Sequence, residues 1–160
     1  ETLPRATDLT LTNGPAEICG GVAVTGALPR VIGFEDTGGA FFSDAACEHS
    51  DDLADDQAVF IETASGVVVV LGCAHAGPVN TLRHISALVG QHRIHAVVGG
   101  MHLENASQTR LDRTVEALRE FDIQRLYPLH CTGFAATARL WREFPGRVSV
   151  CPVGTRWAFG

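Results

Sequence analysis

Residues 67–75 read VVVVLGCAH, and this stretch decides the fold. Its first five residues are all β-branched or aliphatic, a pattern that favours a strand buried on both faces, as in a sheet covered by helices. The run ends at Gly72, and His75 follows three residues later. Open α/β sheets usually bind their ligands just beyond the carboxyl ends of such strands, so the sequence places an imidazole at a ligand-binding edge.

Two later stretches repeat the pattern of a strand that ends at a histidine. Residues 95–98 (HAVV) lead through two glycines to His102, and residues 126–129 (LYPL) lead directly to His130. Helical periodicity separates these strands, which predicts mainly parallel pairing. Parallel pairing brings the strand ends, and the three histidines with them, to one edge of the sheet.

Apolar spacing and capping residues predict the remaining elements. Residues 58–63 pair with 67–71 as a hairpin. Pro78 opens a helix that Gly90 ends, and Ser107 caps a second helix. Thr132 is expected to cap a third helix. In order after the hairpin, we predict a helix over 78–89, a strand over 95–98, a helix over 107–118, a strand over 124–129, a helix over 132–144 and a last strand over 147–151.

The first third of the chain differs from the rest. Residues 1–56 are rich in Gly, Pro, Thr and Asp and contain only short apolar patches, at 22–24 and 31–34. We interpret this segment as loops with one or two short strands that lie over the body formed by 57–160, within a single domain. A loop region of this length is usually functional or depends on neighbouring structure.

Composition excludes several classes of function. The net charge of −6 and the lack of a basic stripe argue against nucleic acid as a partner, and no apolar run approaches the length of a membrane span. The five scattered cysteines form no CxxC pair, which favours a reduced, cytoplasmic protein. Cys73 and Cys131, close to two of the histidines, are interpreted as small core thiols.

The three histidines suggest a metal site. Neutral imidazole suits Zn and related metals, and a catalytic zinc site commonly has three protein ligands and one open position. We therefore predict His75, His102 and His130 as ligands of a divalent metal, with zinc the first expectation. The alternative is that each histidine is an ordinary loop residue. The sequence has no GxGxxG, no P-loop and no serine nucleophile elbow, so neither nucleotide binding nor a serine nucleophile is supported.

Three further residues lie close to these strand ends in the sequence. Gly100 allows backbone to approach a metal or substrate, Thr132 follows His130, and Asp56 abuts a strand. We predict these three residues as substrate-binding.

The combined motifs point to a family. The stretches DDQAVFIETASGVVVVLGCAHAGPVNTLRHI, AVVGGMHL and LYPLHCTG resemble the C-terminal half of metallo-β-lactamase superfamily proteins. Within that superfamily, the likeness is greatest to the branch of the dihydropterin ribofuranosylaminobenzene phosphate synthases, which TGALPRVIGFE at 25–35 also resembles. The resemblance implies an α/β fold, the C-terminal half of an αββα sandwich, with a mixed sheet and helices on one face.

The resemblance also implies roles for the histidines. His75 and His130 match metal-ligating histidines of the family. The position where the family usually has a bridging aspartate reads GGMH here, so His102 is either a ligand or a substrate contact.

One family motif is absent. HxHxDH, which supplies most of the metal ligands in the family, occurs nowhere in the 160 residues. Three explanations stay open: a fragment of a longer protein, one half of a split enzyme, or a half-domain that pairs with a second copy. In each case the partner is a second copy of the chain or a polypeptide that supplies the N-terminal half. Alone, the chain is expected to be inactive or nearly so.

The leading hypothesis is half of a metal-dependent hydrolase, in which metal-activated water attacks a small phosphoester or ester-like substrate. The alternative is a non-catalytic, self-associating α/β module with a degenerate metal site. A regulatory or scaffolding subunit that completes its site on a partner is a third possibility.

Overall fold

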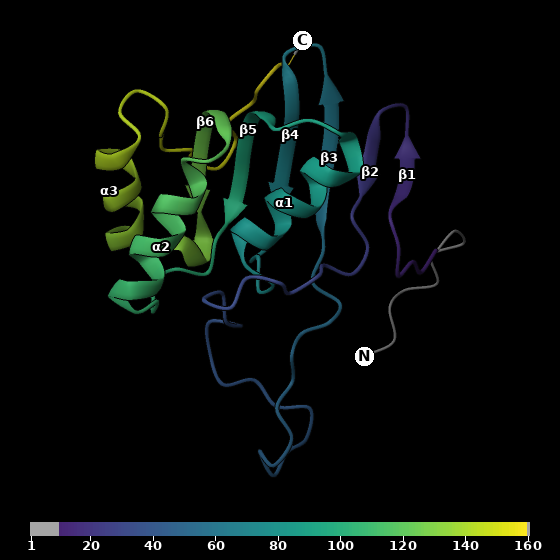
Figure 1. Cartoon of the computed structure of the whole chain (residues 1–160), viewed down its shortest axis with the longest axis vertical. Coiled ribbons are helices and arrows are strands. Elements are labelled where there is room, and N and C mark those ends of the chain that lie inside the picture. The colour runs from purple at the N-terminus through teal and green to yellow at the C-terminus, as the bar shows by residue number, and fades with distance from the viewer. Residues whose placement is uncertain (1–9, 160) are drawn as a thin grey trace.

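A computed structural model describes residues 10–159, which form one six-stranded mixed sheet and three α-helices (Figure 1). The strands follow chain order across the sheet: β1 (Ala16–Cys19), β2 (Val22–Val24), β3 (Ala58–Thr63), β4 (Gly66–Leu71), β5 (Arg93–Gly100) and β6 (Asp122–Leu129). The helices are α1 (Pro78–Val89), α2 (Gln108–Leu118) and α3 (Phe134–Glu143), and a short 3₁₀ turn, η1 (His130–Thr132), follows β6. The predicted α/β class and mixed sheet are confirmed.

Strand direction changes at β4. The strands β1 to β4 pair antiparallel, whereas β4 pairs with β5 and β5 with β6 in parallel. A helix connects each parallel pair, as the alternation of strand and helix patterns predicted. The carboxyl ends of β4, β5 and β6 therefore lie at the same edge of the sheet (Figure 1).

The two faces of the sheet are buried to different extents. On β4, Val67, Val69 and Leu71 belong to the large core that also contains Leu82 of α1. Their neighbour Val68 faces the other way, because side chains alternate along a strand, and it lies in a much smaller cluster with Ala96 and Val98 of β5. Helices thus cover one face of the sheet, and the second face is only partly covered.

Local signals in the sequence set the ends of the helices. Pro78 occupies the first turn of α1, and Gly90 ends this helix in the left-handed conformation. The Ser107 side chain accepts a hydrogen bond from the Arg110 backbone N–H at the start of α2. These three predictions are confirmed.

Two local predictions are wrong. Thr132 does not cap α3: Gly133 is the N-cap residue, and the Thr132 hydroxyl instead accepts a hydrogen bond from the Met101 backbone N–H. Residues 147–151 form only an isolated bridge, between Val148 and Leu126, rather than a strand. Leu126 exchanges backbone hydrogen bonds with Arg147 and Ser149, but the next ladder donor on that side of β6 would be residue 128, a proline without an N–H.

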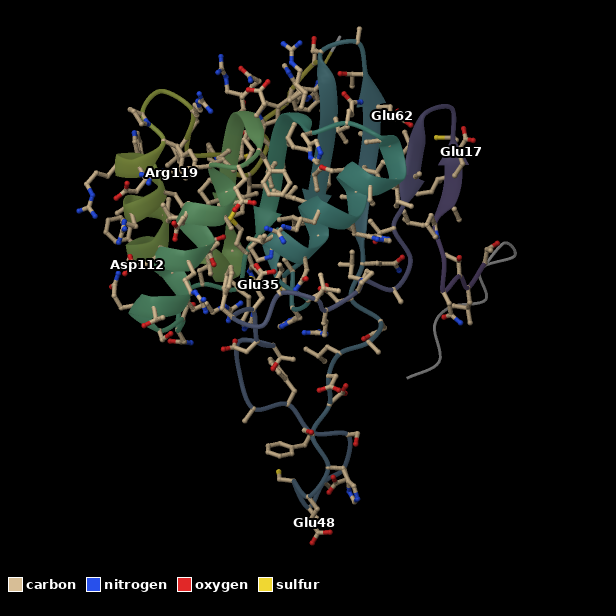
Figure 2. The ribbon with its side chains drawn as sticks, in the orientation of Figure 1. Glu17, Glu35, Glu48, Glu62, Asp112 and Arg119 are labelled. Carbon is tan, nitrogen blue, oxygen red and sulfur yellow. The ribbon has the colours of Figure 1, made fainter. Side chains whose placement is uncertain are left out.

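The segment before β3 has two structural parts. Within the described residues 10–56, β1 and β2 extend the antiparallel side of the sheet, since β2 pairs with β3. The chain between β2 and β3 then passes along the carboxyl ends of the parallel strands and projects beyond them (Figure 1). Its outer part is closed by an antiparallel bridge between Phe42 and Ser50, and Glu48 lies at its tip (Figure 2).

Among the described helices, none combines the length and the apolar character needed to cross a membrane.

Candidate metal centre

Sharp turns follow the three parallel strands. Ala74, His102 and His130 all have positive φ angles, of 54°, 46° and 47°. This left-handed conformation is unfavourable for residues with a side chain, so surrounding structure must hold it, and such residues cluster at functional sites. The chain therefore reverses direction tightly just past β4, β5 and β6, which keeps the histidines at the sheet edge.

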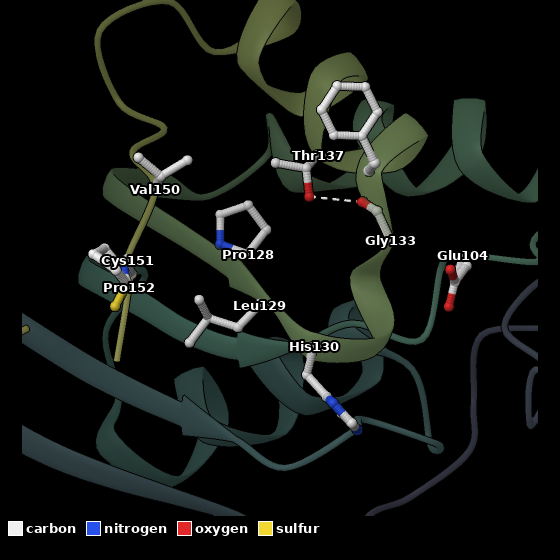
Figure 3. Close-up of a pocket in the computed structure, with 10 residues that line it drawn as sticks. Glu104, Pro128, Leu129, His130, Gly133, Thr137, Val150, Cys151 and Pro152 are labelled. Carbon is white, nitrogen blue, oxygen red and sulfur yellow. Dashed lines mark hydrogen bonds between the residues drawn. The ribbon is translucent and has the colours of Figure 1, made fainter. Parts of the chain in front are cut away.

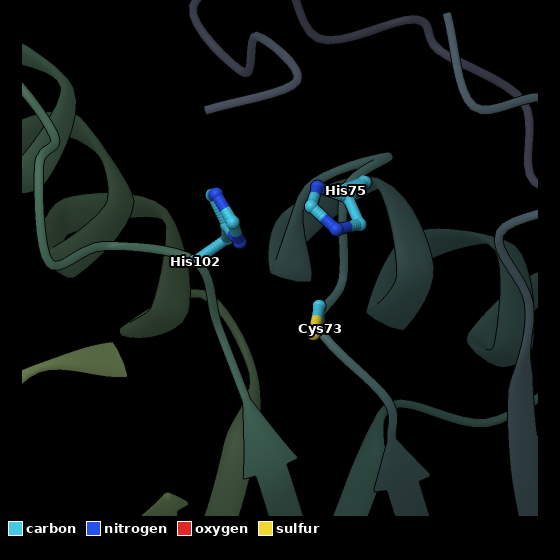
Figure 4. A group of neighbouring side chains, drawn as sticks. All are labelled: Cys73, His75 and His102. Carbon is cyan, nitrogen blue, oxygen red and sulfur yellow. The ribbon is translucent and has the colours of Figure 1, made fainter. Parts of the chain in front are cut away.

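His75 and His102 face each other across this edge (Figure 4). Their ring centroids are 4.2 Å apart. His75 Nδ1 lies 2.9 Å from the carbonyl oxygen of Thr37. Because a carbonyl oxygen only accepts, Nδ1 carries the proton and the Nε2 lone pair is free to bind a metal.

The His102 imidazole has a buried nitrogen without a partner. Among the described residues, no hydrogen-bond partner lies near its Nδ1. Burial, followed by the neighbouring His75 and Arg110, lowers the pKa of His102, while a hydrogen bond with the Gly38 backbone opposes this shift. The ring is therefore held in its neutral form, the form that binds metals.

A loop covers both imidazoles. A Cβ on Gly38, whose φ is +79°, would lie 2.0 Å from the His102 ring, so only glycine permits this close approach. The Phe41 ring meets the His75 ring edge-on, at 5.1 Å between centroids. Backbone and aromatic groups of residues 36–41 thus shield the histidine pair from one side.

Arg110 anchors this loop from α2. Its side chain is only 3% exposed and forms an ion pair with Asp36. Within the described part of the chain, its Nε and Nη2 atoms have no partner. The buried cation therefore holds the loop and also places positive charge near His102, which further favours the neutral imidazole.

Glu35 fixes the other side of the loop (Figure 2). Its carboxylate accepts hydrogen bonds from the backbone N–H groups of Val79 and Asn80, at 2.8 and 2.7 Å, at the start of α1. The Asn80 side chain in turn accepts from the N–H groups of Val31 and Ile32. These bonds tie residues 31–35 to the turn that carries His75.

His130 lies with two cysteines rather than in one trio with the other two histidines. One nitrogen of His130 and the sulfurs of Cys73 and Cys131 all lie within 4.8 Å of one another. Cys73 also belongs to a second such group, with His75 and His102. Burial, with a smaller contribution from the Cys73 thiol, raises the pKa of the Cys131 thiol to about 11. The two groups of potential ligands therefore share Cys73.

The predicted substrate-binding residues have structural contacts at this edge. Asp56 accepts a hydrogen bond from the Ala76 N–H at 2.6 Å and lines a small pocket with Cys73 and His75. Gly100 packs against Cys131, and Thr132 is fully buried. These contacts stabilise the turns after β4, β5 and β6.

A pocket of about 560 Å³ opens beside His130. Figure 3 shows His130 and Glu104 toward one end of it, with Val150, Cys151 and Pro152 along one side. This pocket is a space in which a small molecule could approach His130.

The residues present fit a metal. They supply imidazole nitrogens, among them the buried Nδ1 of His102 that has no hydrogen-bond partner, and thiol sulfurs, and zinc prefers both kinds of donor. His75, His102, His130 and Cys73 are the residues that would hold the metal. Oxygen ligands, which Mg²⁺ and Ca²⁺ require, are not part of either group.

We compared the chain with protein families, curated proteins and solved structures. No protein-family profile matches the chain. The chain is 33% identical over 94 residues to the 7,8-dihydropterin-6-methyl-4-(β-D-ribofuranosyl)-aminobenzene-5′-phosphate synthase of Methanocaldococcus jannaschii, covering 59% of this chain and 32% of that protein. An uncharacterized protein of the same organism is 30% identical over 140 residues, which are 88% of this chain and 51% of that protein.

A solved structure shares the fold at greater coverage. Tm1679, described as a metal-dependent hydrolase of the β-lactamase superfamily, matches with a TM-score of 0.77 and 27% identity over 95% of this chain. The chain shares the fold of this metallo-β-lactamase superfamily hydrolase. It spans 58% of Tm1679 and about half or less of the curated relatives. The resemblance predicted from the motifs is thus confirmed, together with a metal-dependent hydrolase type of fold.

Several residues of this site carry no signal, or a weak one, in the sequence. Glu35, Thr37 and Gly38 lie in a segment whose sequence predicts only loop, and nothing local marks them as neighbours of the histidines. Cys73 was assigned a core role, although its position two residues before His75 was a usable signal.

Proposed function

We propose that this chain carries part of the metal centre of a metal-dependent hydrolase of the metallo-β-lactamase superfamily, acting on a phosphoester or ester-like small molecule. The observation that carries the proposal is the His75–His102 pair, in which the Thr37 carbonyl orients one ring and burial keeps the other neutral. The Tm1679 likeness supports the hydrolase type. The site would be completed by groups outside this chain, as the absence of HxHxDH indicates.

The three histidines have different positions in the proposed site. His75 and His102 would bind the metal together, whereas His130, in the neighbouring group that shares Cys73, lies next to the pocket in which the substrate would lie. When bound, the metal would supply hydroxide at neutral pH by lowering the pKa of water to about 7. The loop 36–41 excludes bulk water from the ring pair, which strengthens electrostatic interactions inside the site.

Zinc titration of the full chain tests the metal assignment. We expect His75→Ala and His102→Ala each to weaken zinc affinity by at least about 100-fold, because loss of even an outer partner costs about 10–100-fold. His92→Ala, at an exposed position before β5, is the matched control and should bind like the unmodified chain. Equal zinc content in all four proteins, by elemental analysis, would contradict the proposal and favour a degenerate site.

We further propose that the partly covered face of the sheet contacts a second polypeptide. Trp157 and Phe159 lie across it, packing on Tyr127 and His95, yet Val70, the penultimate residue of β4, remains 38% exposed. A second copy of the chain is the partner available to the isolated protein. Because the matched residues make up only 32% and 51% of the two curated relatives, a segment outside the matched part could occupy the same face in them.

Sedimentation velocity tests this contact. The chain should sediment as a species heavier than its 17.0 kDa monomer, and Val70→Lys should shift it to the monomer because a charge would be buried in the interface. Val153→Lys, in the exposed tail, should leave the sedimentation unchanged. A chain that is monomeric at every concentration would contradict self-association.

A further inference from the structure

We propose that Cys73, Cys131 and His130 form a thiolate-containing binding site for a thiophilic metal ion such as Zn²⁺ or Cd²⁺. This site shares His130 and Cys73 with the residues that would hold the metal of the proposed hydrolase centre, and it adds the sulfur of Cys131 as a second thiol donor. Cys73 is the member common to this group and to the group that contains His75 and His102.

The topology brings the two cysteines together from distant points of the chain. Cys73 lies two residues beyond the end of β4, and Cys131 lies in η1 directly after β6. Strand β5 runs between these two strands and ends at Gly100. The thiols therefore have to meet across the end of β5.

Gly100 makes this meeting possible. A Cβ at this position would lie 2.6 Å from Cys131 Sγ and 3.3 Å from the Cys73 Cα atom. Because glycine has no side chain, the Cys131 sulfur occupies the space that any other residue would fill. It points toward Cys73, whose carbonyl oxygen accepts a hydrogen bond from it at 3.7 Å. The sulfur is thus directed inward, toward the other potential ligands.

The three donor atoms could bind one ion if they moved slightly closer to one another. The three donor atoms lie within 4.8 Å of one another. With Zn–S and Zn–N distances of about 2.3 and 2.1 Å, donors around a tetrahedral ion lie about 3.5–3.8 Å apart. A shift of about 1 Å or less, within the range of side-chain rotation, would bring the three donors onto the ion. His130 is the exposed member, so an ion and a fourth ligand can enter from that side.

The donor set selects the class of metal. Two thiolates and one imidazole favour Zn²⁺, Cd²⁺ or Cu⁺ over Mg²⁺, Ca²⁺ or Mn²⁺, which prefer oxygen. On binding, each thiol loses its proton to solvent and the sulfur forms a bond to the metal. The chain offers internal controls, because Cys19 and Cys47 are free, exposed thiols outside this cluster.

Cd²⁺ addition to the full, reduced chain tests the site. We expect a thiolate-to-metal charge-transfer absorption band, with Cys73 and Cys131 protected from alkylation while Cys19 and Cys47 react fully. Cys73→Ser and Cys131→Ser should each weaken the band at least tenfold at a fixed Cd²⁺ concentration. The paired control Cys19→Ser/Cys47→Ser should leave the band unchanged.

Two outcomes separate this inference from the proposed function. The inference would be overturned if metal bound without a thiolate band and Cys73 and Cys131 were still alkylated. That result would leave a histidine centre intact. A thiolate band that persists in His75→Ala and His102→Ala would support the inference even if zinc content did not depend on those histidines. If a serine variant fails to fold, alkylation of the unmodified chain with and without Cd²⁺ still tests whether Cys73 and Cys131 bind the metal.

Discussion

Replacing Gly99 with alanine is expected to lower the free energy of unfolding by about 3–5 kcal/mol, the largest effect of any single substitution considered for this chain. Gly99 lies in β5, at the centre of the parallel part of the sheet, with a φ of +133°. A Cβ there would lie 2.2 Å from the Leu71 carbonyl oxygen. That oxygen belongs to the backbone of β4, so the steric overlap could be removed only if β4 and β5 moved apart.

Gly90→Ala is the matched control for this prediction. Gly90 also has a positive φ, of 68°, but a Cβ there would meet nothing within 4 Å. Its substitution carries only the conformational cost, about 1 kcal/mol. Denaturant unfolding followed by circular dichroism measures both variants. Equal losses would show that the close approach of β4 to Gly99 has no energetic consequence.

The second large effect is a pH dependence of stability that originates at Glu35. This side chain is 7% exposed, and its burial raises the pKa of the carboxyl group to about 7, although the N–H donors of Val79 and Asn80 and the charge of Arg110 act in the opposite direction. Between pH 4.5 and about 7 the folded chain keeps a proton that the unfolded chain has lost. The Glu35 contribution is therefore fully present below pH 4.5 and declines as the pH rises toward 7.

Comparison with Glu35→Gln isolates this contribution. Because the side chain of the variant does not titrate, the difference in unfolding free energy between the two proteins should change by about 3 kcal/mol across this pH range. Glu62→Gln, at an exposed position of β3, should show no such change. Chemical denaturation at a series of pH values makes the measurement. Parallel curves for the chain and Glu35→Gln would mean that Glu35 has the same pKa in both states.

Both predictions concern the edge where the proposed metal centre lies. Gly99 sets the separation of the strands that carry His75 and His102, and Glu35 ties the covering loop to α1. A loss of stability at either position should therefore loosen the histidine pair without changing any metal-binding group.

Local chemistry in the sequence determined most of the parallel half of the fold. The apolar run at 67–71 favoured a largely buried strand, Pro78 and Ser107 marked helix starts, and the alternation of strands with helices predicted parallel pairing. From that pairing alone, the histidines after β4, β5 and β6 could be placed at one edge. These features are predictable because each depends on residues that are close in sequence or on a topological rule.

Tertiary structure decided the rest. That Glu35 would bind the start of α1, 44 residues away, or that Thr37 would orient His75, depends on how a loop without periodicity packs, and no local pattern encodes it. Pro128 has no backbone N–H, and at this position of β6 the N–H would have pointed toward residues 147–151, so no seventh strand forms there. The side of β6 toward which residue 128 points is known only once the neighbours of β6 are known. The division of the donors into a histidine pair and a cysteine-rich group was likewise decided by the space at Gly100, which exists only where three strand ends meet.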